Sequence, residues 1–145
     1  MIIREAEEKD ISALVETGKR IHGFNPETEL PFYSDSMGFE LYVMENDDAL
    51  PIAFLCARFD DDTEAEIDYI AIKEEYEGKG LASQFLGELL AEFKNMGIEK
   101  VFLEVRSRNA KAISLYERNG FSQYRIRKNY YVDDDAICYV KEIEK

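Results

Sequence analysis

The sequence predicts an α/β domain with a mixed, mostly antiparallel central sheet and helices on both faces. Apolar residues recur at strand spacing in the first half of the chain, at helical spacing near the middle, and at strand spacing again near the C-terminus. The chain has 145 residues, of which 46% are apolar, so it can bury a full core without a metal or disulfide. We therefore expect residues 1–145 to form a single domain.

The N-terminal quarter predicts a strand, a helix and an irregular segment. Ile2 to Glu5 has strand character, and Asp10 is suited to cap a helix whose apolar residues follow it. Pro26 and Pro31 should keep residues 22–35 from forming a helix. Three aromatic side chains of this segment are expected to form either a small local core, the favoured alternative, or the wall of a substrate cleft: Phe24, Phe32 and Tyr33.

Three strands joined by acidic turns are expected next, over residues 40–44, 52–59 and 66–72. Their order along the chain predicts an antiparallel run of hairpins. In the third strand, strict alternation assigns the side chains to two faces, with Ile67, Tyr69 and Ala71 on one and Asp68, Ile70 and Ile72 on the other.

The second half of the chain predicts a strand–helix–strand crossover, a further helix and a final hairpin. Helical spacing begins near Leu81 and ends at Gly97, a suitable C-terminal cap. The remaining elements are expected as a strand over 100–105, a helix over 110–118 capped by Asn109, and a hairpin of 122–131 with 136–142. The strands on either side of the crossover should be parallel.

Charge and composition exclude several classes of protein. The net charge is −13, from 31 acidic against 18 basic residues, which argues against direct nucleic-acid binding. The acidity favours either a cationic partner or simple solubility. No apolar run is long enough to cross a membrane, and the N-terminus lacks the apolar segment of a signal peptide, so we expect a cytoplasmic protein. The oligomeric state is left open.

The two cysteines, Cys56 and Cys138, lie in apolar strand-like runs and have no spacing typical of a zinc site. We expect both to be reduced, buried and structural. No metal is expected.

A turn with two glycines separates the strand ending near Ile72 from the helix starting near Leu81. The small residues of Gly78-Lys79-Gly80-Leu81-Ala82 would let backbone N–H groups approach an anion, and the helix adds the positive end of its dipole. Phosphate binding is one interpretation, and an ordinary strand-to-helix connection is the other. The spacing matches neither a P-loop nor a dinucleotide fingerprint, so ATP and NAD are weak candidates.

Two residues could handle protons. Glu104 lies in an apolar strand, where it is either a general base or a carboxylate paired with a neighbour such as Arg106. Tyr116 lies on the following helix, where it is either a proton donor or an ordinary packing residue.

Two motifs resemble a known family. The run Glu77-Gly78-Lys79-Gly80-Leu81-Ala82 resembles the Gln/Arg-x-x-Gly-x-Gly/Ala signature of GNAT-type N-acetyltransferases. A second set of residues resembles the ribosomal-protein-alanine N-acetyltransferase branch of this family. The set consists of Leu103-Glu104-Val105-Arg106, Asn109-Ala110, Leu115-Tyr116, Asn119-Gly120-Phe121, Ile126-Arg127 and Asn129-Tyr130-Tyr131.

The resemblance implies a GNAT-like fold, an acetyl group donated by acetyl-coenzyme A, and no metal. It implies Glu104 as general base and Tyr116 as general acid. It also implies a set of donor-binding residues: the backbone of Ile70, Ala71 and Ile72 for the pantetheine arm, the amides of Gly78, Lys79, Gly80, Leu81, Ala82 and Ser83 for the pyrophosphate, and Asn109.

The acceptor that the resemblance implies is a basic protein N-terminus, with an N-terminal Ala of a ribosomal protein as the leading candidate. A small amine, such as a polyamine or an amino sugar, is the alternative acceptor, and a non-catalytic acyl-coenzyme A-binding module is the alternative function. The chain departs from the pattern at Glu77, where the signature has Gln or Arg, and in residues 22–35, which do not match the usual acceptor loop of the branch. An offsetting charge from Lys79, or outward rotation of Glu77, is expected.

Overall fold

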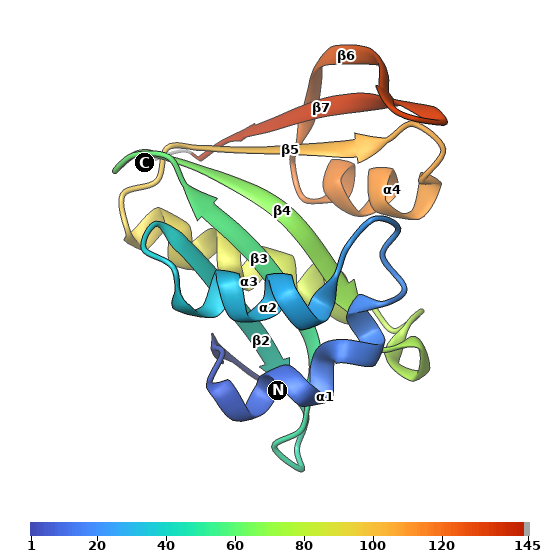
Figure 1. Ribbon diagram of the computed structural model, residues 1–145. Helices are drawn as coiled ribbons and strands as arrows, with labels where there is room; N and C mark the ends of the chain where they lie inside the picture. The colour runs from blue at the N-terminus through green and yellow to red at the C-terminus, as the bar shows by residue number, and fades with distance from the viewer. Residues whose placement is uncertain (144–145) are drawn as a thin grey trace.

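The computed structural model describes residues 1–143, which form one seven-stranded sheet and four α-helices (Figure 1). The elements in chain order are β1 (Ile2–Glu5), α1 (Glu8–Gly18), α2 (Pro26–Asp35), β2 (Phe39–Glu45), β3 (Pro51–Phe59), β4 (Glu64–Ile72), the 3₁₀ turn η1 (Glu74–Tyr76), α3 (Leu81–Asn95), β5 (Lys100–Arg106), α4 (Ala110–Arg118), β6 (Ser122–Tyr131) and β7 (Asp134–Glu142).

The sheet has the order β1-β2-β3-β4-β5-β7-β6. Strands β4 and β5 pair in parallel, and the other five neighbouring pairs are antiparallel. The crossover through α3 connects the parallel pair, as the change from strand to helical spacing predicts. The prediction of a mixed, mostly antiparallel sheet is confirmed.

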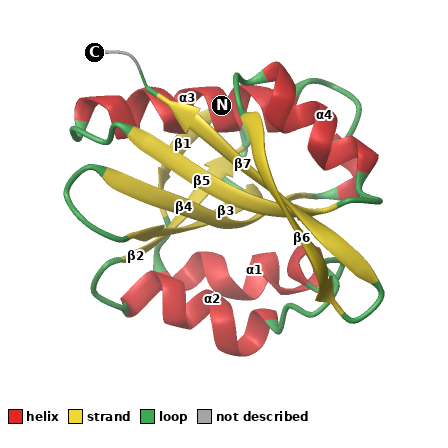
Figure 2. Ribbon diagram, turned by 90° about the horizontal axis from the view of Figure 1, so that it is seen from above, coloured by secondary structure: helices red, strands yellow, loops and turns green. Residues whose placement is uncertain are grey.

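Helices cover both faces of the sheet, as predicted (Figure 2). Helices α3 and α4 lie on one face, where Phe85, Leu89 and Phe93 of α3 pack in a core with the inward side chains of β3, β4 and β5. Helices α1 and α2 lie on the other face, where Leu14 and Leu30 belong to a second, smaller core. The sheet is therefore buried on both faces through its centre.

The segment 22–35 is not irregular, because residues 26–35 form α2, and the sequence-based prediction is wrong here. Pro26 is the first helical residue, where no hydrogen-bonding N–H is needed. Pro31 does remove one bond inside the helix. Burial of Leu30 and Tyr33 against the sheet offsets that loss.

Two of the three aromatic residues of this segment are found in the expected local core, and the third is not. Phe24 and Tyr33 are buried in the second core, as the favoured alternative predicts. Phe32 is 48% exposed and packs edge-on against Phe39, so it is part of the surface instead.

Helix α1 begins earlier than the sequence suggests, because Glu7 and not Asp10 is its N-cap. Asp10 stands three residues further on, and its carboxylate accepts a hydrogen bond from the Glu7 N–H at 2.7 Å. It also accepts two hydrogen bonds from the Arg4 guanidinium. Asp10 thus completes a capping box from inside the helix.

Candidate active site

The parallel strands β4 and β5 separate part of the way along their length. Their ladder runs from Glu64 opposite Lys100 to Ile67 opposite Leu103. Beyond that point β4 remains paired with β3 and β5 with β7, so the two strands diverge, as Figure 1 shows. Asp68 and Glu104 directly follow the last paired residues and stand at the start of this opening.

A β-bulge at Asp68 changes the faces predicted for β4. Cys56 and Ala57 are consecutive on β3, but they pair with Tyr69 and Ile67, which leaves Asp68 as the extra residue. Ile67 therefore packs in the α3 core and Tyr69 in the α2 core, so strict alternation was wrong. Bulges commonly redirect side chains near functional sites.

The side chains of Tyr33 and Arg58 contact the Asp68 carboxylate. The Tyr33 hydroxyl donates a hydrogen bond to its Oδ2 at 2.5 Å, and an Arg58 nitrogen lies 3.9 Å from its Oδ1. Burial raises the pKa of Asp68, with a further contribution from the charge of Glu104. Burial also raises the pKa of Glu66, and the charges of Asp68 and Glu104 contribute to that shift.

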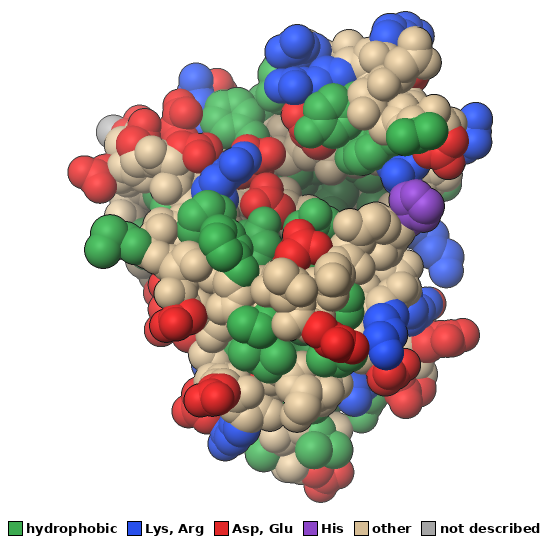
Figure 3. Space-filling model, viewed as in Figure 1, with side chains coloured by type: hydrophobic (Ala, Val, Ile, Leu, Met, Phe, Trp, Pro, Cys, Tyr) green, Lys and Arg blue, Asp and Glu red, His purple; other side chains and the backbone are tan. Residues whose placement is uncertain are grey.

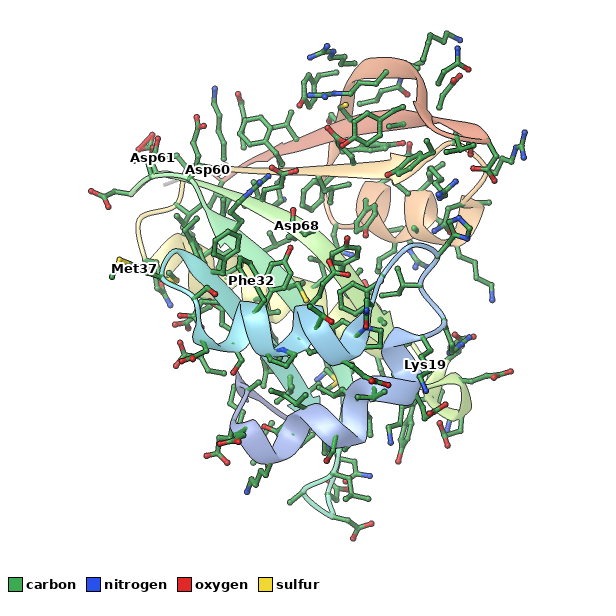
Figure 4. All side chains as sticks on the ribbon, viewed as in Figure 1. Lys19, Phe32, Met37, Asp60, Asp61 and Asp68 are labelled. Atoms are coloured by element: carbon green, nitrogen blue, oxygen red, sulfur yellow. The ribbon has the colours of Figure 1, made fainter. Side chains whose placement is uncertain are left out.

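Three carboxylates, from Glu66, Asp68 and Glu104, stand against two guanidinium groups in the opening, because Arg58 pairs with Glu66 and approaches Asp68 while Arg127 pairs with Glu104, so a net negative charge remains. Figure 3 shows acidic side chains among hydrophobic ones near the centre of this face, while Lys and Arg gather at the top of the view, over β6. Figure 4 places Asp68 in the region between α2 and β5, with Phe32 on α2 below it. A cationic ligand would be attracted to such a site.

Two residues of the C-terminal hairpin contact the Glu104 carboxylate. Its Oε1 lies 3.2 Å from Nε of Arg127 on β6 and 3.9 Å from the Cys138 thiol on β7. The alternative pairing with Arg106 is not found, because the Arg106 guanidinium instead bonds to Asp133 at 2.5 Å. The Glu104 side chain is 20% exposed, so its carboxylate is accessible from the opening.

Tyr116 lies on α4, with its ring buried against Phe121 in an edge-to-face contact at 5.8 Å. Burial raises the pKa of Tyr116, and the neighbouring Tyr131 adds to the shift. Tyr116 therefore keeps its proton at neutral pH. A phenol in this state can donate a proton but cannot act as a base.

Tyr131 connects the two predicted proton-handling groups. It affects the pKa of Tyr116, and its own pKa is raised by burial and by the charge of Glu104. Tyr131 thus responds to the charge of Glu104 on β5 and itself affects Tyr116 on α4, which indicates that these elements bring the two groups into one region. Which proton each residue moves stays a prediction.

The turn before α3 is an open backbone cradle. Gly78 and Gly80 both have φ of +76°, a conformation that favours glycine. A side chain added at either glycine would meet no atom within 4 Å, so the space beside the backbone is free. The amides of Leu81, Ala82 and Ser83 belong to the first turn of α3, where N–H groups lack partners within the helix. This arrangement suits a phosphate group.

The negative charge of Glu77 in this turn is balanced by Arg20, a residue that sequence analysis did not identify. Arg20, after α1, bonds through Nη2 to the Glu77 carboxylate at 2.8 Å and through Nη1 to the Ile72 carbonyl at 3.2 Å. Lys111 adds a weaker contact with Glu77 at 3.8 Å. Lys79 is not the offsetting charge, because its ammonium lies 5.5 Å from the centre of the Tyr76 ring.

The other predicted donor-binding residues surround the same opening. Ile70, Ala71 and Ile72 pair with β3 along one edge, and their other edge faces the gap that β5 leaves. Asn109 caps α4 by accepting a hydrogen bond from the Ala112 N–H at 3.2 Å, as expected. Its contact with a donor molecule stays a prediction.

Residues 1–143 contain no group of three or more His, Cys, Asp or Glu side chains arranged to hold a metal ion. No helix within them is long and apolar enough to cross a membrane. Cys56 and Cys138 are both free and buried, as predicted.

Sequence reasoning missed the role of five residues that shape the opening: Arg20, Tyr33, Glu66, Asp68 and Arg127. The acids on β4 carried the clearest signal, since two carboxylates within an apolar strand need partners or a function. Sequence analysis named Tyr33 and Arg127 but could not predict their contacts, which join segments far apart in the chain.

Comparison with known proteins places this site in a family. Residues 9–121 match the model of the acetyltransferase (GNAT) family. The [ribosomal protein bS18]-alanine N-acetyltransferase of Escherichia coli strain K12 is 34% identical over 134 residues, which cover 92% of this chain and 89% of that protein. An N-alpha-acetyltransferase of Saccharolobus solfataricus is 40% identical over 76 residues, 51% of this chain and 46% of that protein.

A solved structure agrees over nearly the whole chain. The crystal structure of the ribosomal-protein-S18-alanine N-acetyltransferase from Escherichia coli superposes with a TM-score of 0.85 at 30% identity, covering 99% of this chain and 94% of that one. The chain belongs to the GNAT acetyltransferase family. It is an N-acetyltransferase of this family, and a relative of the enzymes that acetylate ribosomal protein bS18.

Proposed function

We propose that this enzyme transfers an acetyl group from acetyl-coenzyme A to the α-amine of a protein N-terminus in the cytoplasm, with an N-terminal Ala of a ribosomal protein as the leading acceptor. The observation that carries the proposal is the opening between β4 and β5, where Glu104 directly follows the last residue of β5 that pairs with β4. The Escherichia coli relative that aligns with most of the chain is a [ribosomal protein bS18]-alanine N-acetyltransferase, which supports the choice of acceptor.

The donor substrate fits the features of the opening. Its pyrophosphate would lie on the amides of Gly78 to Ser83, where the space beside Gly78 and Gly80 is free. Its pantetheine arm would extend along the edge of Ile70 to Ile72 that does not pair with β3 or β5, where Arg20 bonds to the Ile72 carbonyl. The thioester would then reach the start of the opening, where a backbone N–H near Ile72 could polarise its carbonyl.

The chemistry is direct attack within a ternary complex. A peptide α-amine has a pKa of roughly 7.7–8.0, so much of it is protonated at neutral pH. Glu104 accepts that proton, directly or through a water, and the free amine attacks the acetyl carbonyl carbon. The carbon–sulfur bond breaks, and Tyr116 gives its proton to the departing thiolate. The nitrogen loses its second proton as the amide forms, and that proton returns the Tyr116 phenolate to its neutral form through solvent. No acyl-enzyme forms, so neither cysteine takes part.

The acidic opening supports a cationic acceptor. Glu66 and Asp68 lie beside Glu104, and the whole chain carries a net charge of −13. Catalytic efficiency on a basic peptide should therefore fall as ionic strength rises, because salt screens the attraction. A small polyamine would be attracted by the same charges, so the acceptor must be decided by experiment.

The test is thiol release from acetyl-coenzyme A, with mass analysis of the acceptor. The acceptors are a basic peptide that begins with Ala, the same peptide with a blocked N-terminus, and a panel of polyamines and amino sugars. One acetyl group on the free Ala peptide, and none on the blocked peptide, is the expected result. Acetylation of the small amines alone would overturn the acceptor, and binding without release would overturn the enzymatic function.

A further inference from the structure

Arg127 places a cation on the group that the reaction needs as a base. Its Nε lies 3.2 Å from Glu104 Oε1, and its guanidinium lies 5.4 Å from the centre of the Tyr130 ring. Within residues 1–143 this Nε is buried yet has no hydrogen-bond partner, so the contact is close but poorly aligned. The charge of Glu104 raises the pKa of Arg127, which keeps the guanidinium protonated.

A guanidinium and an α-ammonium offer Glu104 the same things, a positive charge and N–H donors. The two cations repel each other when they are on one carboxylate, and the guanidinium already occupies Oε1 of Glu104. The Arg127 guanidinium does not lose its proton at neutral pH, so no proton passes to Glu104 within this pair. While Arg127 is bound to it, Glu104 is not available as a base for the acceptor.

We propose that Arg127 is an internal competitor for the acceptor: in the free enzyme it occupies the place beside Glu104 that the acceptor's ammonium takes, and the two exchange when the acceptor binds. This inference rests on the proposed function, since it assumes that Glu104 receives the acceptor's proton.

The local structure allows the Arg127 side chain to leave without unfolding the hairpin. Strand β6 is an edge strand whose side chains are largely exposed. Its pairing with β7 is interrupted between Arg127 and Tyr131, and Asn129 in this interval has φ of +53°. The interval is fixed independently, because the Asn129 N–H donates to Asp135 Oδ1 at 2.8 Å. The guanidinium can therefore swing away while the backbone stays in place.

The exchange would make the enzyme selective. A cationic acceptor brings an ammonium group to Glu104 in place of the Arg127 guanidinium. The negative charge of Glu104 is therefore balanced before and after the exchange. A neutral or blocked N-terminus that displaced Arg127 would leave Glu104 without a counter-charge, close to Asp68 and to Glu66, which is paired with Arg58. Arg127 thus acts as a specificity-determining residue that disfavours uncharged acceptors.

The experiment compares Arg127→Gln with Arg125→Gln in the intact enzyme. Arg125 lies on the same strand and the substitution changes the net charge equally, so it controls for overall attraction. The readouts are KM and kcat for a basic peptide beginning with Ala, and the Kd of that peptide measured calorimetrically without acetyl-coenzyme A. Arg127→Lys, which restores a cation, and a Glu104→Gln background complete the set.

We expect Arg127→Gln to lower KM and Kd about two- to fivefold more than Arg125→Gln, in keeping with a partly exposed ion pair. Arg127→Lys should return both values toward those of the parent, and the effect should vanish in the Glu104→Gln background. Equal KM and Kd in the two Gln variants would overturn the inference, as would a fall in kcat at unchanged KM. Failure of the parent to bind or acetylate any amine would overturn the proposed function, and the inference with it.

Discussion

Replacing Tyr116 with Phe separates catalysis from stability. The ring of Tyr116 is buried and contacts Phe121 at 5.8 Å, and a Phe ring would keep that contact. The hydroxyl has no hydrogen-bond partner among residues 1–143, so losing it should change the free energy of unfolding by less than about 1 kcal/mol. Loss of a general acid should lower kcat by about 10²–10⁴-fold, equivalent to roughly 3–5 kcal/mol of barrier.

Tyr139→Phe is the matched control. Tyr139 is also a buried tyrosine, but its hydroxyl donates to Glu117 at 2.9 Å. Its loss should cost about 1–2 kcal/mol of stability and leave kcat nearly unchanged. The two variants are compared by thiol release at saturating substrates and by urea unfolding. An unchanged kcat in Tyr116→Phe, or a loss of rate that merely follows a loss of stability in both variants, would refute the reasoning.

Three further predictions follow from other parts of the structure. Gly80→Ala and Gly97→Ala both place a side chain at positive φ and should each cost about 1 kcal/mol of stability, but only the first should raise KM for acetyl-coenzyme A. Asp68→Asn should raise KM for a basic peptide about two- to fivefold, whereas Asp60→Asn, which removes an equal charge at an exposed Arg58 contact, should not. Burial, with the nearby charge of Glu5 next, raises the pKa of Glu40 to about 7. The folded state then binds the extra proton, so stability should fall as pH rises from about 4 to 7, and Glu40→Gln should raise the melting temperature at about pH 8 but not near pH 4.

Much of the fold could be predicted because its signals are local. The hydrophobic periods of β3, α3 and β5 survive in the structure, and Gly97 with its positive φ ends α3 as expected. The error at α2 has a physical cause. Two prolines argue against a helix when only local preference is considered, and the burial of Leu30 and Tyr33 that outweighs them depends on a sheet far away in the chain.

The chemical groups of the candidate site could be predicted from the sequence, but the residues that contact them could not. Glu104 and the Gly78–Gly80 turn were identified because a carboxylate or a glycine pair in such a setting needs a reason. The bulge at Asp68 could not be foreseen, since it depends on register against β3. The ion-pair partners of Glu77 and Glu104 could not be predicted either. Arg20 and Arg127 contact these carboxylates from segments that are distant in the sequence.

The central claim is that one opening brings donor, base and acid together, and the position of bound coenzyme A tests it most directly. A crystal structure of the complex should show the pyrophosphate on the backbone amides of Gly78 to Ser83 and the sulfur within hydrogen-bonding distance of the Tyr116 hydroxyl. A sulfur directed away from Tyr116, or a pyrophosphate bound elsewhere, would contradict the account.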